Sequence, residues 1–442
     1  MSQKRTGMGV VFFCLLIDMI GFGIIIPFLT YMVADLGAAN RGGEGLWVAL
    51  VMSAYAFTTF LFSPMWGGLS DRIGRRPVLL IGIAGNGLSF LAFGLSGSLE
   101  FALAVRLMHG FFNANIGVGR AFIADISEPH ELARRQGLIG VAFGVGFSLG
   151  PGIGGLLSNP AAQSWGSIFI GTVFEAYPYL LPCAFAATIS ALGWLYALRA
   201  LPESLPPEAR TKGGSVNPFT KVLDNLGNIR RVMAHPLLAP ILLSMTSFWL
   251  GFTIMHATFI LYTKMTPDAG GLGFDEQANG LVFMFIGLIG IIVQGRLIGP
   301  LTNRFGSNHL MLVGFIVGGI GLTAIPSTSI GTGWWAIAVV TGLVAIGNGL
   351  VSPSNMALLS HHAPGDRRGL VMGVSESLRA LSSMFGVLIG GLVWDKTHTA
   401  TGLFDYHTVF WISGACAFMA AVLFRMSKAW HAPSPGTEGE SE

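Results

Sequence analysis

The sequence predicts an all-α integral membrane protein of twelve transmembrane helices, arranged as two pseudo-symmetric six-helix bundles with both termini in the cytoplasm. Three observations lead to this fold class. Of the 442 residues, 52% are hydrophobic and only 11% are charged, with a mean hydropathy of +0.65, whereas soluble domains carry about 25% charged residues. The apolar residues form twelve runs of about 20 residues, the length that crosses a bilayer. The two halves of the sequence also repeat one another.

Each apolar run is interpreted as one transmembrane span. The runs lie near residues 8–33, 46–69, 78–95, 99–123, 138–157, 177–201, 237–265, 278–301, 310–325, 334–359, 370–394 and 407–426. Lys and Arg in short loops mark the cytoplasmic side of a membrane protein. Most of the 25 Lys and Arg residues fall on the predicted inner side, whereas the outer loops hold Arg41, Lys264 and Lys396. This asymmetry predicts the orientation.

A polar stretch after the sixth run divides the chain. The predicted organisation is an N-terminal six-helix bundle (1–201), a cytoplasmic linker (202–236), a C-terminal six-helix bundle (237–430) and a polar tail (431–442). A shift of 232 residues aligns the halves and places Gly67, Arg72 and Gly74 over Gly299, Arg304 and Gly306. Duplicated halves are how many secondary transporters build a binding site at the bilayer midplane.

The segment after the second predicted span carries the first motif. It reads Gly67-Gly68-Leu69-Ser70-Asp71-Arg72-Ile73-Gly74-Arg75-Arg76 and matches G-x-L-x-D-R-x-G-R-[KR], so the chain resembles the major facilitator superfamily. Gly67 and Gly74 permit tight backbone contact and a turn, and Asp71 suits a helix N-terminus or an arginine partner. The resemblance implies a cytoplasmic gate in which Asp71 and Arg75 couple to Asp125. The alternative is that the charges only set the topology. The predicted gate comprises Gly67, Asp71, Arg72, Gly74, Arg75, Arg76 and Asp125.

Two charged residues within spans are candidates for proton coupling. Asp18 lies about 12 Å inside the first span, and Arg106 lies about 10 Å from the outer end of the fourth. A charge at such depth must be neutralised, paired or hydrated. In a core about 30 Å thick the two are about 8 Å apart vertically, so direct contact requires a stretched arginine or a water. Asp18 is a proton carrier or a structural partner, and Arg106 is functional or snorkels to the surface.

The surroundings of both residues extend the resemblance. Arg106-Leu107-Met108-His109-Gly110 resembles a second motif of the superfamily, whose Arg is associated with proton transfer. An acid nine residues before Pro27 resembles the first span of tetracycline/proton antiporters and of drug/proton and zinc-induced-facilitator-like carriers. Tetracycline exporters also have an Asp in the third span, where this sequence has Ser89. That difference argues against a metal-tetracycline chelate as the substrate.

The fifth predicted span contains a glycine-rich motif. It reads Gly146-Phe147-Ser148-Leu149-Gly150-Pro151-Gly152-Ile153-Gly154-Gly155 and matches g-x-x-x-G-P-x-x-G-G, a pattern typical of antiporters in the superfamily. Glycines four residues apart form a flat face for close helix packing, and proline bends a helix. We interpret the span as an antiporter hinge, with simple close packing as the alternative. The residues of this antiporter motif are Gly146, Gly150, Pro151, Gly154 and Gly155.

The remaining candidates lie on other spans. Glu376 and Arg379 are three residues apart and therefore share a helix face, where they form either a proton relay or a local salt bridge. By resemblance, the first, fourth, seventh and tenth spans line a central cavity. Aromatic, amide and imidazole candidates on these spans are Phe22, His109, Asn113, Asn115, Trp249, Phe252, His256 and Asn348. Polar groups in an apolar pocket suit an amphipathic organic substrate.

Together these features predict a secondary active transporter, a proton-coupled antiporter that exports a small amphipathic organic compound by alternating access. The alternatives are a facilitator or proton symporter of a polar metabolite, and a non-transporting membrane sensor or lipid-handling protein. The expected partners are the substrate, protons and the lipid bilayer, with no nucleic acid, metal or cofactor, and the monomer is the expected functional form. The sequence contains no G-x-x-x-x-G-K-[ST] phosphate loop, and its G-x-S-x-G match at residues 146–150 falls within a predicted helical span, so it is no serine nucleophile elbow. Both observations disfavour an enzyme. The expected location is a plasma or inner membrane, with an organelle membrane left open.

Overall fold

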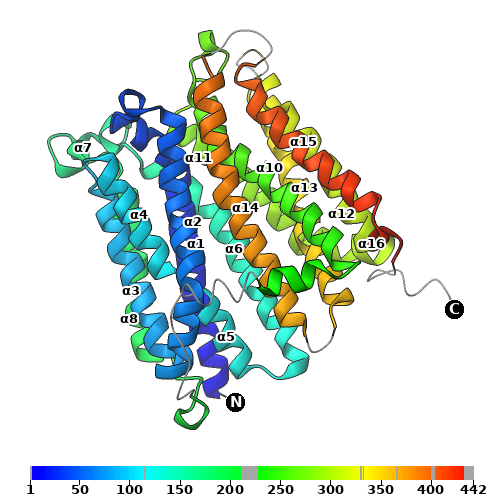
Figure 1. Ribbon diagram of the computed structural model, residues 1–442. Coiled ribbons are helices and arrows are strands. Elements are labelled where there is room, and N and C mark those ends of the chain that lie inside the picture. Colours follow the sequence, from blue (N-terminus) through cyan, green and yellow to red (C-terminus); the bar gives the residue numbers. More distant parts are fainter. Residues whose placement is uncertain are drawn as a thin grey trace. The chain divides into compact units, whose positions relative to one another are not determined.

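The computed structural model of the chain describes residues 2–113, 116–210, 227–328, 331, 333–364, 367–399 and 404–432. Within these ranges every regular element is a helix (Figure 1). Nine of the described helical segments are long and apolar enough to cross a membrane. The predicted class of helical membrane protein is therefore confirmed, whereas the count of twelve spans and the orientation of the termini remain predictions.

The described helices fall into two series along the chain. Before residue 210 these are α1 (Ser2–Asp35), α2 (Glu44–Ile73), α3 (Arg75–Gly94), α4 (Leu99–Asn113), α5 (Ile116–Ile126), α6 (Pro129–Leu157), α7 (Val173–Ala176) and α8 (Leu180–Ala200). After residue 227 they are α10 (Leu238–Lys264), α11 (Glu276–Ile292), α12 (Ile298–Ala324), α13 (Gly333–His362), α14 (Arg368–Thr397), α15 (His407–Arg425) and α16 (Lys428–His431). A π-helical turn, Val293–Leu297, joins α11 to α12. In the predicted linker, residues 207–209 and 227–233 are helical.

Three predicted spans differ in outline from the helices. The predicted span 99–123 is divided between α4 and α5, on either side of residues 114–115, which lie outside the described ranges. The predicted spans 278–301 and 310–325 belong to one segment, Glu276–Ser327. Its backbone leaves helical geometry at Gly306, where φ is 73°. Gly74, 232 residues earlier, has a φ of 106°. The sequence repeat thus recurs as a backbone conformation that glycine adopts readily.

The described residues form two compact units. Unit 1 lies within Met1–Arg41, Ala54–Leu223 and Glu276–Met284, and unit 2 lies within Gly42–Ser53, Asp224–Asp275 and Phe285–Glu442. The first turns of α2 therefore belong to unit 2, and the first turns of α11 belong to unit 1. Each unit holds the start of one helix whose remainder belongs to the other unit.

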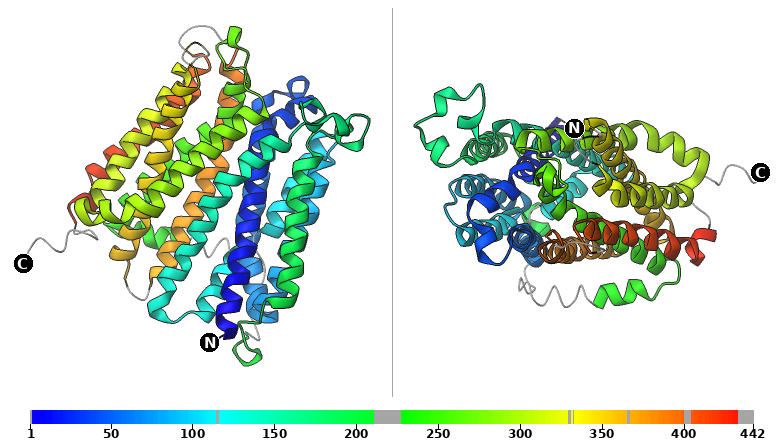
Figure 2. Two further views of the ribbon diagram at one scale, coloured as in Figure 1. Left: turned by 180° about the vertical axis from the view of Figure 1, so that it is seen from behind. Right: turned by 90° about the horizontal axis from the view of Figure 1, so that it is seen from above.

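Close helix packing in unit 1 depends on glycine. Helix α1 packs between α6 and α8, and α3 packs against α8 and α4 (Figure 2). A Cβ atom on Gly23 of α1 would lie 2.7 Å from the carbonyl oxygen of Gly146 on α6. Lipid supplies no hydrophobic drive for helix association, so small residues that allow backbone contact stabilise such pairs.

Glycine also allows close helix packing in unit 2. Helix α10 packs against α14 and α15, and α12 packs against α13. A Cβ atom on Gly347 of α13 would lie 2.6 Å from the Cα atom of Gly318 on α12, and one on Gly386 of α14 would lie 2.8 Å from the carbonyl oxygen of Leu250 on α10. Large aromatic rings fill the remaining interior, among them Phe248, Tyr262, Phe315, Phe410 and Phe424.

Candidate functional site

The loop between α2 and α3 holds a network of charges centred on Arg75, whose side chain is only 10% exposed. Its Nη1 atom lies 2.6 Å from Asp71 Oδ1 and also donates to Ser70 Oγ at 2.5 Å. Its Nε atom donates to Asp125 Oδ2 over 3.1 Å. The structure thus brings together the three charged residues that the first motif and its resemblance placed at a gate. A guanidinium fork can hold two carboxylates at once, which an ammonium group cannot do in this geometry.

Two further residues complete the Arg75 network. Glu203 accepts the backbone N–H of Arg75 at 2.8 Å and that of Arg76 at 3.2 Å, so its carboxylate caps the start of α3. Ser204 Oγ donates to Asp125 Oδ2 at 2.9 Å. Anionic groups stabilise helix N-termini because the N–H dipoles point toward them.

The glycines and the other arginines of the motif differ in their surroundings. The Glu203 carboxylate occupies the space that a Cβ atom on Gly74 would need, so this position requires glycine. The expectation of tight contact is wrong for Gly67, where an added Cβ atom would meet no described atom within 4 Å. Arg76 Nη2 donates to the carbonyl oxygen of Leu198 at 2.8 Å, and Arg72 is half-buried in the last turn of α2.

A second polar cluster lies inside unit 1 and takes one residue from each of four helices. Asp18 on α1 is 4% exposed, and its Oδ1 atom accepts from Asn86 Nδ2 on α3 at 3.3 Å. Asn86 Nδ2 also donates to Asn113 Oδ1 on α4 at 3.0 Å. Asn113 Nδ2 in turn donates to the hydroxyl of Tyr55 on α2. A continuous chain of hydrogen bonds therefore leads from Asp18 to Tyr55.

Arg106 lies at the far end of this chain and is 3% exposed, so its guanidinium does not snorkel. The guanidinium carbon is 4.7 Å from the centroid of the Tyr55 ring, within the range of a cation–π contact. Arg106 Nη1 is 3.3 Å from Nδ1 of His109, which is itself buried. Since a guanidinium can only donate, His109 Nδ1 accepts here. The Tyr55 ring also packs 5.3 Å from that of Phe22.

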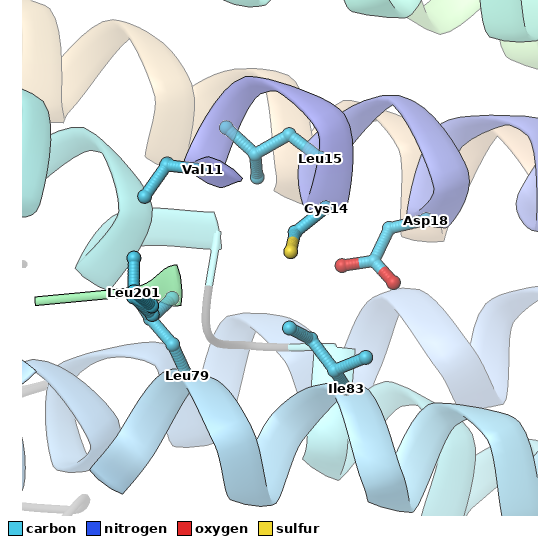
Figure 3. A pocket seen from close by; sticks show the side chains of 7 residues that line it. All are labelled: Val11, Cys14, Leu15, Asp18, Leu79, Ile83 and Leu201. Carbon is cyan, nitrogen blue, oxygen red and sulfur yellow. The ribbon is translucent and has the colours of Figure 1, made fainter. Parts of the chain in front are cut away.

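Figure 3 shows the apolar pocket into which the Asp18 carboxylate is directed. The pocket lies between α1 and α3 and reaches Leu201 at the end of α8. Apart from Asp18, its lining consists of Val11, Cys14, Leu15, Leu79, Ile83 and Leu201. A carboxylate in such surroundings is stabilised by little except the amide of Asn86, because the pocket walls offer no other strong hydrogen-bond donor.

The glycines of the fifth-span motif face two different helices. On α6, added Cβ atoms at Gly146, Gly150 and Gly154 would all meet the backbone of α1; the one at Gly150 would lie 2.6 Å from the carbonyl oxygen of Ile20. At Gly155, a Cβ atom would instead lie 3.0 Å from the Cα atom of Gly280 on α11. Pro151 lies inside α6, which continues past it to Leu157. The motif therefore seats α6 against both α1 and the first turns of α11.

Hydrogen bonds and an ion pair hold the starts of α2 and α11. In unit 2, Asp395 on α14 accepts the backbone N–H groups of Gly45 and Leu46 at 2.8 and 2.7 Å, and Glu44 pairs with Lys264 at 2.6 Å. In unit 1, Asn279 on α11 donates to the hydroxyl of Tyr31 at 2.7 Å. Both helices thus begin on polar contacts with residues distant in sequence.

A third group of candidates lies in unit 2. Arg379 Nε donates to Glu376 Oε2 at 2.9 Å on α14, and its guanidinium carbon lies 5.5 Å from the centroid of the Trp249 ring on α10. The rings of Trp249 and Phe252 are 5.3 Å apart, and Phe252 stacks on His256 at 6.3 Å. Trp249 Nε1 is buried and has no hydrogen-bond acceptor among the described residues. Asn348 accepts from Ser352 on the same helix at 3.4 Å, and Asn115 lies outside the described residues.

The family follows from comparison with known proteins. The model of the Major Facilitator Superfamily matches residues 11–299 and 296–441, nearly the whole chain. The chain belongs to this superfamily. It is 26% identical over 414 residues to the tetracycline resistance protein, class C, of Escherichia coli, covering 94% of this chain and 95% of that protein. It is 25% identical to protein ZINC INDUCED FACILITATOR-LIKE 1 of Arabidopsis thaliana, covering 90% and 86%. The predicted resemblance is therefore confirmed.

A solved structure supports the fold of this superfamily member. The crystal structure of the human organic anion transporter MFSD10 (TETRAN) superposes with a TM-score of 0.67 and 23% sequence identity, covering 95% of this chain and 99% of that one. The protein is a multi-pass membrane transporter, as the family and its apolar helices indicate. Within the described residues, no group of three or more His, Cys, Asp or Glu side chains is placed to hold a metal ion.

Sequence reasoning missed Tyr55, Asn86, Glu203 and Ser204 as site residues. Asn86 offered one signal, an amide in an otherwise apolar run at 78–95. Glu203 and Ser204 directly follow a predicted span, where polar residues are ordinary in a loop and do not indicate a site. Their partners on α3 and α5 are 128 and 79 residues away in sequence, so no local pattern identifies them.

Proposed function

We propose that this transporter is a proton-coupled antiporter that exports a small amphipathic organic compound by alternating access. In this proposal it is a monomer of twelve spans with both termini in the cytoplasm, and residues 1–201 and 237–430 form the two bundles. Asp18 exchanges the proton. The observation that carries the proposal is the burial of the Asp18 carboxylate among four helices, with an amide as its hydrogen-bond donor.

The surroundings of Asp18 suit a group that alternates between charged and neutral forms. An ionised carboxylate held permanently in an apolar interior is costly unless a cation is paired with it. At Asp18 the hydrogen bond comes from a neutral amide, while the Arg106 guanidinium stacks on the Tyr55 ring. The Asp18 site can therefore accept a proton without breaking an ion pair. This supports Asp18 over Glu376, which is already paired with Arg379.

The substrate class rests on unit 2. Trp249, Phe252 and His256 line one side of α10 as a ladder of rings, and the Glu376–Arg379 pair lies at its Trp249 end. A flat aromatic compound would stack on the ladder, and an oxygen acceptor on it would satisfy the buried Trp249 N–H group. Two of the relatives reported above, a tetracycline resistance protein and an organic anion transporter, fit such compounds.

The Arg75 network fits a gate that opens and closes as the transporter alternates. It joins α2, α3 and α5 with the segment after α8 through the buried Arg75 guanidinium, three carboxylates and the Ser204 hydroxyl. Such a network has one well-defined arrangement and is lost as a unit when one helix shifts. Asp71 and Arg75 of this network lie in the superfamily signature, which supports the assignment of the network to the cytoplasmic side.

Reconstitution in proteoliposomes tests the proposal. With an acidic interior and the membrane potential clamped, an antiporter accumulates an amphipathic probe against its gradient; ethidium serves as the cation and carboxyfluorescein as the anion. We expect Asp18→Asn to abolish this accumulation while leaving probe exchange without a pH gradient. Asp268→Asn, an exposed acid in a loop, is the matched control and retains accumulation. Probe transport that ignores the imposed pH gradient in the unmodified protein refutes proton coupling.

A further inference from the structure

The hydrogen-bond chain beside Asp18 is built so that every bond in it can reverse. Asn86 donates in both directions, with one N–H bond to Asp18 Oδ1 and the other to Asn113 Oδ1. Asn113 is likewise the donor in the next bond, to the Tyr55 hydroxyl. An amide presents two donors on its nitrogen and two lone pairs on its oxygen. A half-turn of Asn86 therefore exchanges two donated bonds for two accepted ones.

The opposite side of Asn86 does not resist such a turn. Asn86 is 1% exposed, yet its Oδ1 atom has no hydrogen-bond partner among the residues that the structure describes. Buried polar atoms are nearly always paired, so an unpaired amide oxygen in a packed interior is unusual. Rotation about the last side-chain bond breaks no hydrogen bond at Oδ1 within the described part of the chain. The amide is held on one side only, by Asp18 and Asn113.

Protonation of Asp18 supplies the reason to turn. A carboxylate accepts hydrogen bonds, whereas a carboxylic acid donates one through its O–H group. When Asp18 gains a proton, its O–H group needs an acceptor, and the turned Asn86 Oδ1 provides it. The Asn113 amide turns as well, so that Asn86 Oδ1 also accepts from Asn113 Nδ2 and Asn113 Oδ1 accepts from the Tyr55 hydroxyl. The chain keeps all three bonds and reverses each of them.

We propose that Asn86 is an amide switch: its side chain inverts when Asp18 is protonated and carries that change through Asn113 to Tyr55. This inference rests on the proposed function and deepens it, since Asn86 is a positioning residue for the proton site. The Tyr55 hydroxyl changes from acceptor to donor while its ring lies against Arg106. Protonation of Asp18 on α1 thereby changes the hydrogen bonding of Tyr55 on α2, the helix that also carries Asp71.

Few other titratable groups lie near this chain. Cys14 on α1 and Tyr55 on α2 interact electrostatically with Asp18, and Arg106 and His109 on α4 lie beyond Tyr55. The residues flanking Asp18 meet glycines on the neighbouring helices. Gly119 on α5 faces Leu15, Gly146 on α6 faces Met19, and Gly193 on α8 faces Ile17. The N–H bond from Asn86 is therefore the main local interaction that favours the charged form of Asp18.

The test measures the pH at which ethidium transport by reconstituted full-length protein is half-maximal. Asn86→Leu removes one hydrogen bond from each form of Asp18. The bond to the carboxylate is charge-assisted and the stronger of the two, so its loss favours the acid, and we expect this midpoint to rise by up to about one pH unit. Asn308→Leu is the matched control. Asn308 is also buried, and its Oδ1 atom likewise has no partner among the described residues, but its amide donates to the backbone carbonyls of residues 430 and 432. The midpoint of Asn308→Leu stays unchanged. Asn86→Gln, which restores an amide, moves the midpoint back toward that of the unmodified protein.

The outcomes separate this inference from the proposed function. If Asp18→Asn loses the pH dependence but Asn86→Leu keeps the original midpoint, Asn86 is no switch and Asp18 remains the proton site. If Asp18→Asn keeps the original pH profile, both proposals fail. Should Asn86→Leu not fold, Asn86→Ser replaces it, since its side chain is too short to reach Asp18. In the double variant Asp18→Asn/Asn86→Leu, we expect no effect beyond that of Asp18→Asn alone.

Discussion

Two glycines of α6, on either side of Pro151, lead to opposite predictions for a substitution by alanine. A Cβ atom at Gly150 would lie 2.6 Å from the carbonyl oxygen of Ile20, whereas ordinary contact begins at 3.4 Å. Gly150→Ala therefore has to separate α6 from α1 locally by the difference, about 0.8 Å. The three described atoms nearest to a Cβ atom at Gly152 all belong to the Met284 side chain, with Sδ at 2.9 Å. That flexible side chain can move aside.

The difference between the two variants isolates the cost of the backbone clash. Both substitutions gain about 1 kcal/mol because alanine favours the helix more than glycine does. Only Gly150→Ala also overpacks the helix interface, which destabilises the fold by about 1–3 kcal/mol. Thermal unfolding of the purified protein, followed by the loss of the monodisperse peak, should give a lower midpoint for Gly150→Ala than for Gly152→Ala. Gly152→Ala should equal or exceed the unmodified protein. Equal midpoints for the two variants refute the assignment of the Gly150 face to α1.

Two further substitutions address the gate and the aromatic ladder. Arg75→Lys keeps the charge but cannot hold Asp71 and Asp125 together, so we expect transport to fall about tenfold or more at equal protein amount. Arg41→Lys, in an exposed pair with Glu100, is the control. If Arg75→Lys transports as well as the unmodified protein, the guanidinium fork has no role in the gate. Trp249→Phe removes the buried N–H group and keeps a ring beside Arg379, so KM for an oxygen-bearing aromatic probe should rise about tenfold with kcat retained. The exposed Trp411→Phe should leave KM unchanged, and a change in kcat alone would contradict substrate contact at Trp249.

The fold class was predictable because the signals for it are local. Apolar runs give the helices, and the signature motif places a turn at Gly74. The repeat predicts a second turn 232 residues later, and Gly306 has it. Spans eight and nine were harder to divide, because their helices continue through the turn with only Gly306 leaving helical geometry. The span around 114–115 was likewise predicted as one helix, and its described parts are α4 and α5.

The interior of unit 1 was only partly predictable. A helix that is apolar on all sides has no periodic pattern of polar residues, so its sequence does not indicate which face packs against which neighbouring helix. Depth alone predicted that direct contact between Asp18 and Arg106 requires a stretched arginine or a water. It did not reveal that Asn86, Asn113 and Tyr55 connect them, because that depends on the rotation of three helices about their axes. The Arg75 network was more accessible, since Asp71 and Arg75 are four residues apart and the resemblance supplied Asp125.

Carboxylates from distant parts of the chain cap the starts of α2 and α3, and this arrangement makes a testable claim about how the helices are held. Asp395 binds the N–H groups of Gly45 and Leu46 across about 350 residues of sequence, with separations of 350 and 349. Glu203 does the same for Arg75 and Arg76. Asn and Gln each offer one acceptor oxygen without the charge, so Asp395→Asn and Glu203→Gln should weaken each cap by about 1 kcal/mol or more.

Hydrogen exchange measures this loss where it occurs. In Asp395→Asn, the first-turn amides of α2 should exchange roughly five- to tenfold faster, because local opening becomes easier by about that free energy, while the α3 amides keep their rate. Glu203→Gln should show the reverse pattern, and the exposed Glu100→Gln should change neither. Uniform acceleration in both helices would mean that the carboxylates stabilise the whole fold instead of one helix start each. Separate responses would make each cap an independent clamp, so that withdrawing α14 from α2 releases one helix start without disturbing the Arg75 network.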